Sequence, residues 1–352
     1  MNIWGYILKR VLLMIPTLLG VLTLTFAVIQ FVPGGPVEQM VAQLRGKQGA
    51  SGGEAAAAQG IYRGAQGISA QQLAELRKLY GFDKPPLERY GLMLWDFARF
   101  DLGRSYYHHE DVSTLIAQRL PVSISLGLWN FLLTYLISIP LGIAKAVRHG
   151  TRFDLATSVV VLVGYAIPGF VLGVLLLVLF AGGTWLQWFP LRGLVSDGWS
   201  HFGFWHKIGD YLWHITLPVL ASTAGSFAVI TMLTKNAFLE EIRKQYVLTA
   251  RAKGLSERAV LWRHVLRNAL VPLVTGFPAA FIGAFFASSL LIETLFSLPG
   301  LGLLSYEAVM RRDYPVVMGS LYLFTLIGLV TKLIADLSYV WVDPRIQFEA
   351  LR

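Results

Sequence analysis

A lysine and an aspartate stand four residues apart in the last long apolar segment of the chain, at Lys332 and Asp336. Side chains at positions i and i+4 share one face of a helix, so this ammonium and carboxylate can form an ion pair. Ionisable residues inside membrane spans often mark ion or proton pathways. Two interpretations stay open: a structural intramembrane charge pair, and a relay that couples transport to an ion. We favour the structural pair, because Lys332 can extend its ammonium towards the membrane surface.

Motifs for phosphate, metal or hydrolytic chemistry are absent from the sequence. The Gly-Lys pair at 46–47 is followed by Gln48, so no Walker-type phosphate loop is present. Neither an H-E-x-x-H nor a G-x-S-x-G pattern occurs. His108 and His109 are adjacent in a loop, where a solvated surface pair is favoured over a metal site. The chain has no cysteine and therefore no disulfide. We expect no catalytic residue, no metal site and no cofactor in this chain.

Composition places the chain among membrane proteins. Of its 352 residues, 55% are hydrophobic and 14% are charged, whereas a soluble domain has about 25% charged residues. Crossing the hydrocarbon core takes about 20 apolar residues in a helix. Six segments meet that need: 11–31, 121–144, 155–180, 215–234, 269–292 and 316–340. The fold class that we expect is an all-α polytopic membrane protein with six transmembrane helices.

The positive charges predict the orientation of these spans. The net charge is +9, and cytoplasmic loops of membrane proteins collect Lys and Arg. Three basic residues lie in loop 145–154 and eight in loop 235–268, against two each in 181–213 and 293–315. Both termini, including the tail 341–352, are therefore expected in the cytoplasm. Nucleic-acid binding does not fit, because no basic domain with interleaved aromatic residues lies outside the spans.

The N-terminal segment 1–32 is expected to remain as the first span. Its apolar run is longer than that of a cleaved signal peptide, and no A-x-A site follows it. The long loop 33–120 then lies outside. It holds a Gly- and Ala-rich insertion at 46–67, which we expect to be flexible.

Two helices are expected in the rest of this loop. Ser69 to Gln72 reads as a capping box for a helix that Gly81 ends. A second amphipathic helix is predicted to start near Pro86 and to end before Gly103. Its apolar face would carry Leu87, Leu94, Phe97 and Phe100. Together these helices predict an external helical cap.

The 235–268 loop is more ordered than a solvated connection needs to be. A helix is predicted from Asn236 to Lys253, with Gly254 just past its end. Ser256 can cap a second, short helix. That helix would carry an apolar stripe and a charged face: Leu255, Ala259, Trp262 and Leu266 on one side, and Glu257, Arg258, Arg263 and Arg267 on the other. Two interpretations stay open for it: docking into a groove of a soluble partner, and packing on the membrane surface.

The residues of this loop resemble the E-A-A-x-x-x-G loop of permease subunits of ATP-binding-cassette (ABC) importers. Ala250, Gly254 and the later His264, Asn268 and Pro272 carry the likeness. The chain departs from the pattern in having Thr249 in place of the Glu and Arg251 in place of the second Ala. The form T-A-R-A-K-G is similar to the oligopeptide and dipeptide permease branch.

Other segments resemble the same branch. They are Asp83-Lys84-Pro85, Asp101-Leu102-Gly103, the run Glu293 to Gly302, Arg312-Asp313-Tyr314-Pro315 and Asp343-Pro344-Arg345. Within the branch, Gly34 to Val37, Tyr80 to Pro85, Pro190 to Ser196 and Tyr211 to Pro218 resemble the permease of Yej-type peptide importers. That family takes up peptides and peptide-like antibiotics of the microcin C kind.

This resemblance implies a type I ABC importer permease fold, with a five-helix core at 121–340. The implied partners are a homologous second permease, two ATP-binding domains that bind ATP and Mg²⁺, and a periplasmic peptide-binding protein. The ATPase-coupling residues would be Thr249, Ala250, Arg251, Lys253, Gly254, Leu255, Arg258 and Trp262.

Cargo and path stay less defined. Polar residues in the spans that are candidates for a translocation path are Ser222, Thr223, Ser226, Ser288 and Ser289. Dipeptide or nickel cargo, and an ion-coupled secondary transporter working alone, are the alternatives. The secondary transporter is disfavoured because we find no internal repeat and only one charge pair in the spans.

Overall fold

The computed structural model describes residues 3–31, 83–182, 186–286 and 289–342. The predicted insertion at 46–67, the capping-box helix and the tail from 343 onward lie outside these residues, as does Ser288. Within the described ranges the regular structure is helical, and the one β-bridge joins Arg104 to Asp111. The chain divides into two compact units: 1–8 with 119–303 and 328–352, and 9–118 with 304–327.

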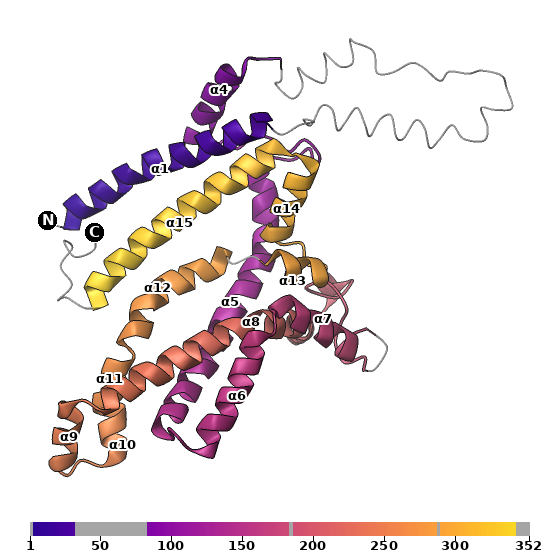
Figure 1. The fold of residues 1–352 in the computed structure, drawn as a ribbon. Coiled ribbons are helices and arrows are strands. Elements are labelled where there is room, and N and C mark those ends of the chain that lie inside the picture. The colour runs from indigo at the N-terminus through magenta and orange to yellow at the C-terminus, as the bar shows by residue number, and fades with distance from the viewer. Residues whose placement is uncertain (1–2, 32–82, 183–185, 287–288, 343–352) are drawn as a thin grey trace. The chain divides into compact units, whose positions relative to one another are not determined.

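Four long apolar helices correspond to predicted spans (Figure 1). They are α1 (Ile3–Phe31), α5 (Val112–Val147), α8 (Phe204–Ile242) and α15 (Tyr314–Val342). Each is long enough to cross a hydrocarbon core at 1.5 Å per residue. Two bent helix pairs supply up to two further spans. The expected class of an all-α polytopic membrane protein is therefore confirmed.

The third predicted span, 155–180, is broken rather than continuous. It consists of α6 (Arg152–Ala166) and α7 (Gly169–Phe180), which meet at 97°. Pro168 lies at the break, since proline has no N–H for the ladder and clashes with the preceding turn. Three other prolines, Pro140, Pro218 and Pro278, stay inside α5, α8 and α12.

The fifth predicted span, 269–292, is also divided. The short helix α11 (Leu266–Ala269) leads into α12 (Val271–Phe286), and the segment Glu257–Ala269 is bent by 50° from Val271–Ala284. Its last residues belong to a separate helix, α13 (Leu290–Leu295).

The larger unit has an apolar core where α7, α8 and α13 meet. Buried members include Leu126 from α5, Leu177 from α7, Ala221 from α8 and Phe296 after α13. Small residues allow the helices to approach closely. A Cβ on Gly169 would lie 2.7 Å from the carbonyl oxygen of Ala221, so only glycine fits there.

The smaller unit contains α4 (Pro86–Ala98), most of α1 and of α14 (Leu301–Arg311), the start of α5 and the first half of α15. The predicted start at Pro86 is confirmed, since proline occupies the first helical position. Phe97 is buried and packs on Tyr322 at 5.2 Å between ring centroids. The predicted apolar face is wrong at both ends. Leu87 is 85% exposed, and Phe100 follows the end of the helix with φ +62°.

Candidate functional site

The 235–268 loop folds into two short helical arms. The first is α9 (Gln245–Ala252), and the second runs through α10 (Glu257–Ala259), the π-helix η2 (Val260–Val265) and α11. The predicted continuous helix from Asn236 to Lys253 is wrong, because α8 ends at Ile242. The Lys244 ammonium bonds to the Glu241 carboxylate at this break, which raises the pKa of Lys244.

The turn between the arms has the geometry that the sequence predicts. Gly254 follows the C-cap of α9 with φ +78°, in the left-handed region that glycine adopts most readily. The Ser256 hydroxyl accepts a hydrogen bond from the Ala259 N–H and caps α10. Arg251 closes the turn: its Nε and Nη2 donate to the two Glu257 carboxylate oxygens at 2.8 and 3.2 Å. Such a two-point contact has a defined geometry.

Both arms rest on a buried apolar base formed by α5, α8 and the loop itself. Its buried members are Ala146, Phe238, Val247, Ala250, Val260, Val265 and Ala269. The buried stripe of the second arm differs from the predicted one, because the π-helix places Val260 and Val265 on the same side. Leu255 and Trp262, which the sequence predicts on the packed face, are 40% and 59% exposed.

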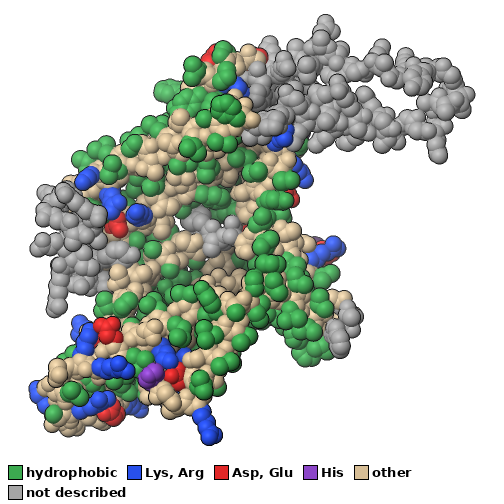
Figure 2. Space-filling model, viewed as in Figure 1, with side chains coloured by type: hydrophobic (Ala, Val, Ile, Leu, Met, Phe, Trp, Pro, Cys, Tyr) green, Lys and Arg blue, Asp and Glu red, His purple; other side chains and the backbone are tan. Residues whose placement is uncertain are grey.

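The coupling residues implied by resemblance therefore divide into two groups. Ala250 is buried in the base, whereas the other seven lie exposed on the surface. A concave surface of about 560 Å³ is lined by Ser256, Arg258, Ala259, Trp262 and Arg263. Figure 2 shows Lys and Arg side chains gathered over the region of α9 and α10. Exposed tryptophan and arginine occur both on protein-docking surfaces and on helices that pack on a membrane surface, so this composition is compatible with both interpretations.

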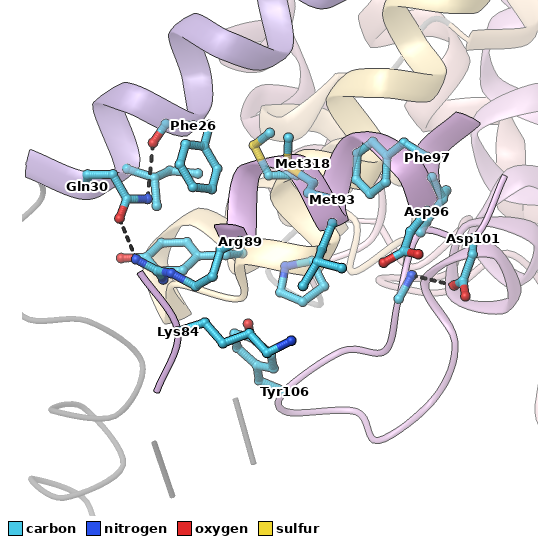
Figure 3. Close-up of a pocket in the computed structure, with 16 residues that line it drawn as sticks. Phe26, Gln30, Lys84, Arg89, Met93, Asp96, Phe97, Asp101, Tyr106 and Met318 are labelled. Carbon is cyan, nitrogen blue, oxygen red and sulfur yellow. Dashed lines mark hydrogen bonds between the residues drawn. The ribbon is translucent and has the colours of Figure 1, made fainter. Parts of the chain in front are cut away.

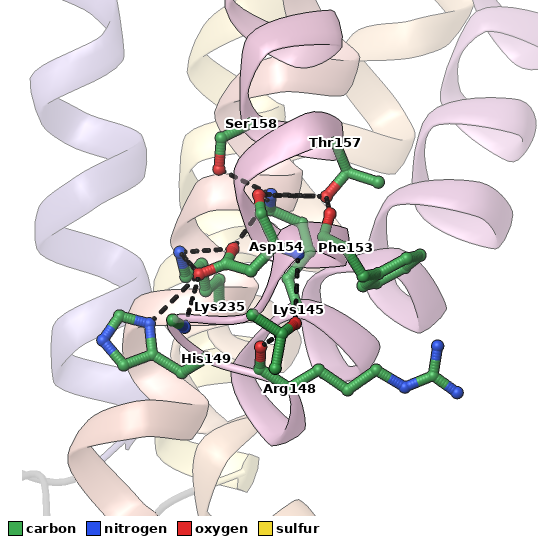
Figure 4. A network of polar contacts seen from close by, with 10 residues as sticks. Lys145, Arg148, His149, Phe153, Asp154, Thr157, Ser158 and Lys235 are labelled. Carbon is green, nitrogen blue, oxygen red and sulfur yellow. Dashed lines mark hydrogen bonds and ion pairs between the residues drawn. The ribbon is translucent and has the colours of Figure 1, made fainter.

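A buried ionic network lies beside this base (Figure 4). Lys145 of α5, Asp154 of α6 and Lys235 of α8 are all buried. Lys235 donates to both Asp154 carboxylate oxygens at 2.7 and 2.9 Å, and Lys145 approaches the carboxylate at 3.2 Å. Lys145 also donates to the hydroxyls of Thr157 and Ser158.

This network joins the ends of α5, α6 and α8. It lies next to the apolar base in the chain, because Lys145 directly precedes Ala146 and Lys235 stands three residues before Phe238. The positive-inside pattern identified these lysines only as loop charges. An aspartate at the end of the basic loop 145–154 was the available signal, but sequence alone did not indicate its partners.

Some of the predicted path residues line two cavities among the membrane spans. Ser226 lines a cavity of about 520 Å³ with Tyr135 and Tyr165, and Ser222 and Ser289 line one of about 330 Å³. Gly127 and Asn130 line both cavities, so the two adjoin at α5. Thr223 is buried instead, and its hydroxyl donates to the Val219 carbonyl at 2.6 Å. Sequence reasoning missed Asn130, although an amide in an apolar segment was a signal.

The predicted ion pair between Lys332 and Asp336 is not formed. The Tyr6 hydroxyl donates to Asp336 Oδ2 at 2.9 Å, while Lys332 is exposed. The aspartate thus bonds to α1, and Lys332 lies exposed, which suits a long side chain that can reach the membrane surface. The structure gives no support to a two-residue charge relay at this place.

The run Glu293 to Gly302 contains a buried carboxylate. The sequence analysis used this run only for its resemblance and did not predict the burial of Glu293. Glu293 is fully buried, and its Oε2 accepts the Leu303 N–H at 2.7 Å, which caps the start of α14. The Ser123 hydroxyl bonds to its other oxygen at 3.4 Å. A Cβ on Gly300 would overlap this carboxyl group, so glycine is required there. Burial raises the pKa of the Glu293 carboxyl.

Comparison with known proteins identifies the class. Residues 138–348 match the family model described as the binding-protein-dependent transport system inner membrane component. The match covers more than half of the chain, so the chain belongs to this family of ABC importer permeases. It is a multi-pass inner-membrane transport subunit.

Relatives align over nearly the whole chain. The peptidoglycan transport system permease YejB of Agrobacterium fabrum is 54% identical, with 98% of each chain covered. The inner membrane ABC transporter permease YejB of Escherichia coli O157:H7 is also 54% identical, over 98% of this chain and 99% of its own. The oligopeptide transport system permease AppB of Bacillus subtilis is 32% identical, over 98% of this chain and 99% of its own.

Proposed function

We propose that this permease carries peptides or peptide-like compounds, including those of the microcin C kind, across the inner membrane. The observation that carries the proposal is the match to permeases named for peptide transport, which are 32% to 33% identical over at least 97% of the chain. Nickel cargo finds no support among these relatives. An ion-coupled transporter working alone is disfavoured by the family and by the unpaired arrangement of Lys332.

We propose that this chain forms half of the transporter. This subunit pairs with a homologous second permease, and two ATP-binding domains, separate or fused, dock beneath. ATP and Mg²⁺ bind in those domains and not in this chain. The 235–268 loop faces the cytoplasm, and a periplasmic binding protein delivers peptide from the opposite side.

The mechanism uses the loop as a lever. Closure of the ATP-binding domains presses on Trp262, Leu255 and the surrounding arginines. The Arg251–Glu257 contact holds the two arms at a fixed angle, so they move together. Ala250 and its neighbours pass the force to α8, and the Asp154 network ties α8 to α5 and α6. Polar side chains in the adjoining cavities, Asn130 among them, line the path that opens.

Peptidoglycan fragments are a second cargo candidate, and the name of the 54% identical Agrobacterium fabrum relative favours them. Both cargo types present peptide bonds to a path whose described polar lining is uncharged: Asn130, Thr134, Tyr135, Tyr165, Ser222, Ser226 and Ser289. Such a lining suits hydrogen bonding to amides more than recognition of one charge.

Uptake into proteoliposomes tests the function. The chain is purified with the subunits that accompany it from its own membranes, and ATP-dependent uptake of trialanine, a muropeptide and nickel is compared. The proposal expects saturable trialanine or muropeptide uptake that requires ATP and the binding protein. Nickel uptake alone, or uptake that persists without ATP, would overturn it. The native mass of the same preparation should contain this chain once, a second permease and two ATP-binding domains.

A further inference from the structure

A separate pocket lies within the unit formed by 9–118 and 304–327, and its lining shares no residue with the loop or with the two path cavities. Its volume is about 340 Å³, within the range of small-molecule sites. The middle of the pocket is apolar and is lined from α1, α4 and α15. The main apolar residues are Phe26, Met93, Phe97, Pro315 and Met318.

Charged side chains lie at the two ends of this pocket. Figure 3 shows Lys84 and Arg89 at one end and Asp96 and Asp101 at the other, with Met93 and Met318 between them. Arg89 is held in place, since its Nη2 donates to Gln30 Oε1 at 2.7 Å. Lys84 Nζ also lies 3.3 Å from Glu88 Oε1, so the Arg89 guanidinium is the main source of positive charge at its end. The pocket therefore has a cationic end, an apolar middle and an anionic end.

The helix geometry sets the distance between these ends. Arg89, Met93 and Asp96 share one face of α4, because they stand at i, i+4 and i+7. Seven residues at 1.5 Å each separate Arg89 from Asp96 by about 10 Å along the axis. An extended peptide gains about 3.3–3.6 Å per residue, so the termini of a tripeptide are also separated by about 10 Å.

We propose that this pocket binds short zwitterionic peptides of about three residues. The C-terminal carboxylate lies towards Arg89 and Lys84, the N-terminal ammonium lies towards Asp96, and side chains contact Met93 and Met318. A zwitterionic lipid headgroup fits less well, because only two carbons separate the ammonium of phosphatidylethanolamine from its phosphate. The inference rests on the proposed function: the pocket opens on the external side and holds cargo before it enters the path cavities.

Partly exposed ion pairs contribute little each, so we expect a dissociation constant of about 1 mM. Binding of this strength suits a site that concentrates peptide near the mouth of a transporter and releases it readily. The site is distinct from the path cavities, whose described polar lining carries no charge.

Cysteine protection tests the inference, because the chain has no native cysteine. Met93→Cys places a thiol in the pocket, and Leu87→Cys places a control thiol on the exposed side of the same helix. The complete importer is held in phosphatidylcholine nanodiscs without ATP, and maleimide labelling rates are measured. At about 10 mM trialanine, labelling at position 93 should slow about tenfold and labelling at 87 should not change. N-acetyl-trialanine amide, which lacks both end charges, should not protect.

Charge variants complete the test. Arg89→Met or Asp96→Asn, each combined with Met93→Cys, should abolish protection. The same charge variants combined with Leu87→Cys should keep an unchanged labelling rate, which shows that α4 is intact. Equal protection by the blocked peptide, or no protection by trialanine, overturns the inference. Slower labelling on changing the lipid to phosphatidylethanolamine without peptide also overturns it and assigns the pocket to lipid.

Uptake measured in parallel separates the two proposals. Uptake without protection refutes only the pocket, and protection without uptake refutes only the importer function.

Discussion

Gly254 has a backbone conformation that other residues adopt only at a cost. Its φ is +78°, yet an added Cβ would meet no atom within 4 Å, so the penalty is conformational rather than steric. Left-handed backbone costs about 1–2 kcal/mol for most residues, and Asn tolerates it better. We therefore expect peptide-stimulated ATP hydrolysis to be reduced least in Gly254→Asn, more in Gly254→Ala and most in Gly254→Val. Membrane insertion should be unchanged in all three.

A matched control is Gly209→Ala in α8, where the added methyl group also meets nothing within 4 Å and φ is not positive. That variant should keep wild-type ATP hydrolysis. Wild-type stimulation in Gly254→Val would contradict the role of the turn as a rigid part of the lever.

Asp154 is the single carboxylate between two buried lysines in the described network. Asp154→Asn leaves the ammonium groups of Lys145 and Lys235 without a carboxylate. Breaking a buried pair in this way costs about 3–5 kcal/mol. We expect a clearly lower thermal midpoint for the purified importer, and Asp197→Asn, at an exposed aspartate, serves as the control.

The double variant Asp154→Asn with Lys235→Met sharpens this test. Removing one unpaired cation should recover part of the stability, so the effects of the two substitutions should not add. Equal midpoints for Asp154→Asn and Asp197→Asn would show that the network contributes nothing.

The buried Glu293 carboxyl, which lies outside the predicted spans, should make the stability of the protein depend on pH. Burial raises the pKa of its carboxyl above the ordinary value of 4.5, so folding favours the protonated form. The stability contributed by this group is present below pH 4.5 and is lost as the pH rises through the raised pKa. Glu293→Gln stays neutral throughout.

We therefore expect the thermal midpoint of Glu293→Gln, relative to wild type, to increase as the pH rises above 4.5. Differential scanning fluorimetry at several pH values measures it, and Glu307→Gln provides a control glutamate. A difference that stays constant with pH would contradict the raised pKa.

At the scale of the elements, Trp262 is the central exposed residue of the second loop arm. Truncating an aromatic residue at the centre of an interface commonly costs about 2 kcal/mol or more, which is about a 30-fold loss of affinity. Trp262→Ala should therefore weaken association with the ATP-binding domains without unfolding the permease, because the side chain is 59% exposed. Co-purification at increasing dilution measures this loss.

Trp205→Ala removes an equally large side chain that is 81% exposed at the start of α8. It should leave association unchanged. If both variants associate normally, the concave surface around Trp262 is not where the ATP-binding domains dock.

The positions of the helices could be predicted from the sequence better than their breaks. Apolar runs located every long helix, and Pro86 and Gly254 marked a start and an end correctly. The break after Ile242 and the π-helix from Val260 could not be predicted, because both depend on packing against α5 and α8. Proline was an ambiguous signal: Pro168 breaks its span, whereas Pro140 stays inside α5.

The candidate site was predictable in part. Resemblance located the loop, and seven of the eight coupling residues that it implies are exposed, whereas Ala250 is buried. The apolar pattern of the sequence placed Leu255 and Trp262 on the packed face, which is wrong. The Asp154 network could not be predicted, since Lys235, which donates to both carboxylate oxygens, lies 81 residues further along the chain. The supposed pair of Lys332 and Asp336 failed for the same reason, because Tyr6 on another helix satisfies the aspartate.

At the scale of the whole molecule, the mechanism requires the 235–268 loop to lie in the cytoplasm, where ATP is found. The distribution of Lys and Arg between short loops predicts that orientation. The same orientation places α4 and the start of α8 outside. Because the chain has no cysteine, single thiols can report each side without background labelling.

Leu87→Cys, Trp205→Cys and Leu248→Cys place thiols at three exposed positions, in α4, α8 and α9. On intact spheroplasts, a membrane-impermeant maleimide should label positions 87 and 205, and should label position 248 only after permeabilisation. The opposite pattern would invert the topology. It would place the Trp262 surface away from ATP and the peptide pocket on the cytoplasmic side, so the lever and the external cargo site would both be lost. Labelling of all three positions on intact cells would instead refute the crossing of the membrane by α8, since position 205 lies at its start and position 248 follows its end.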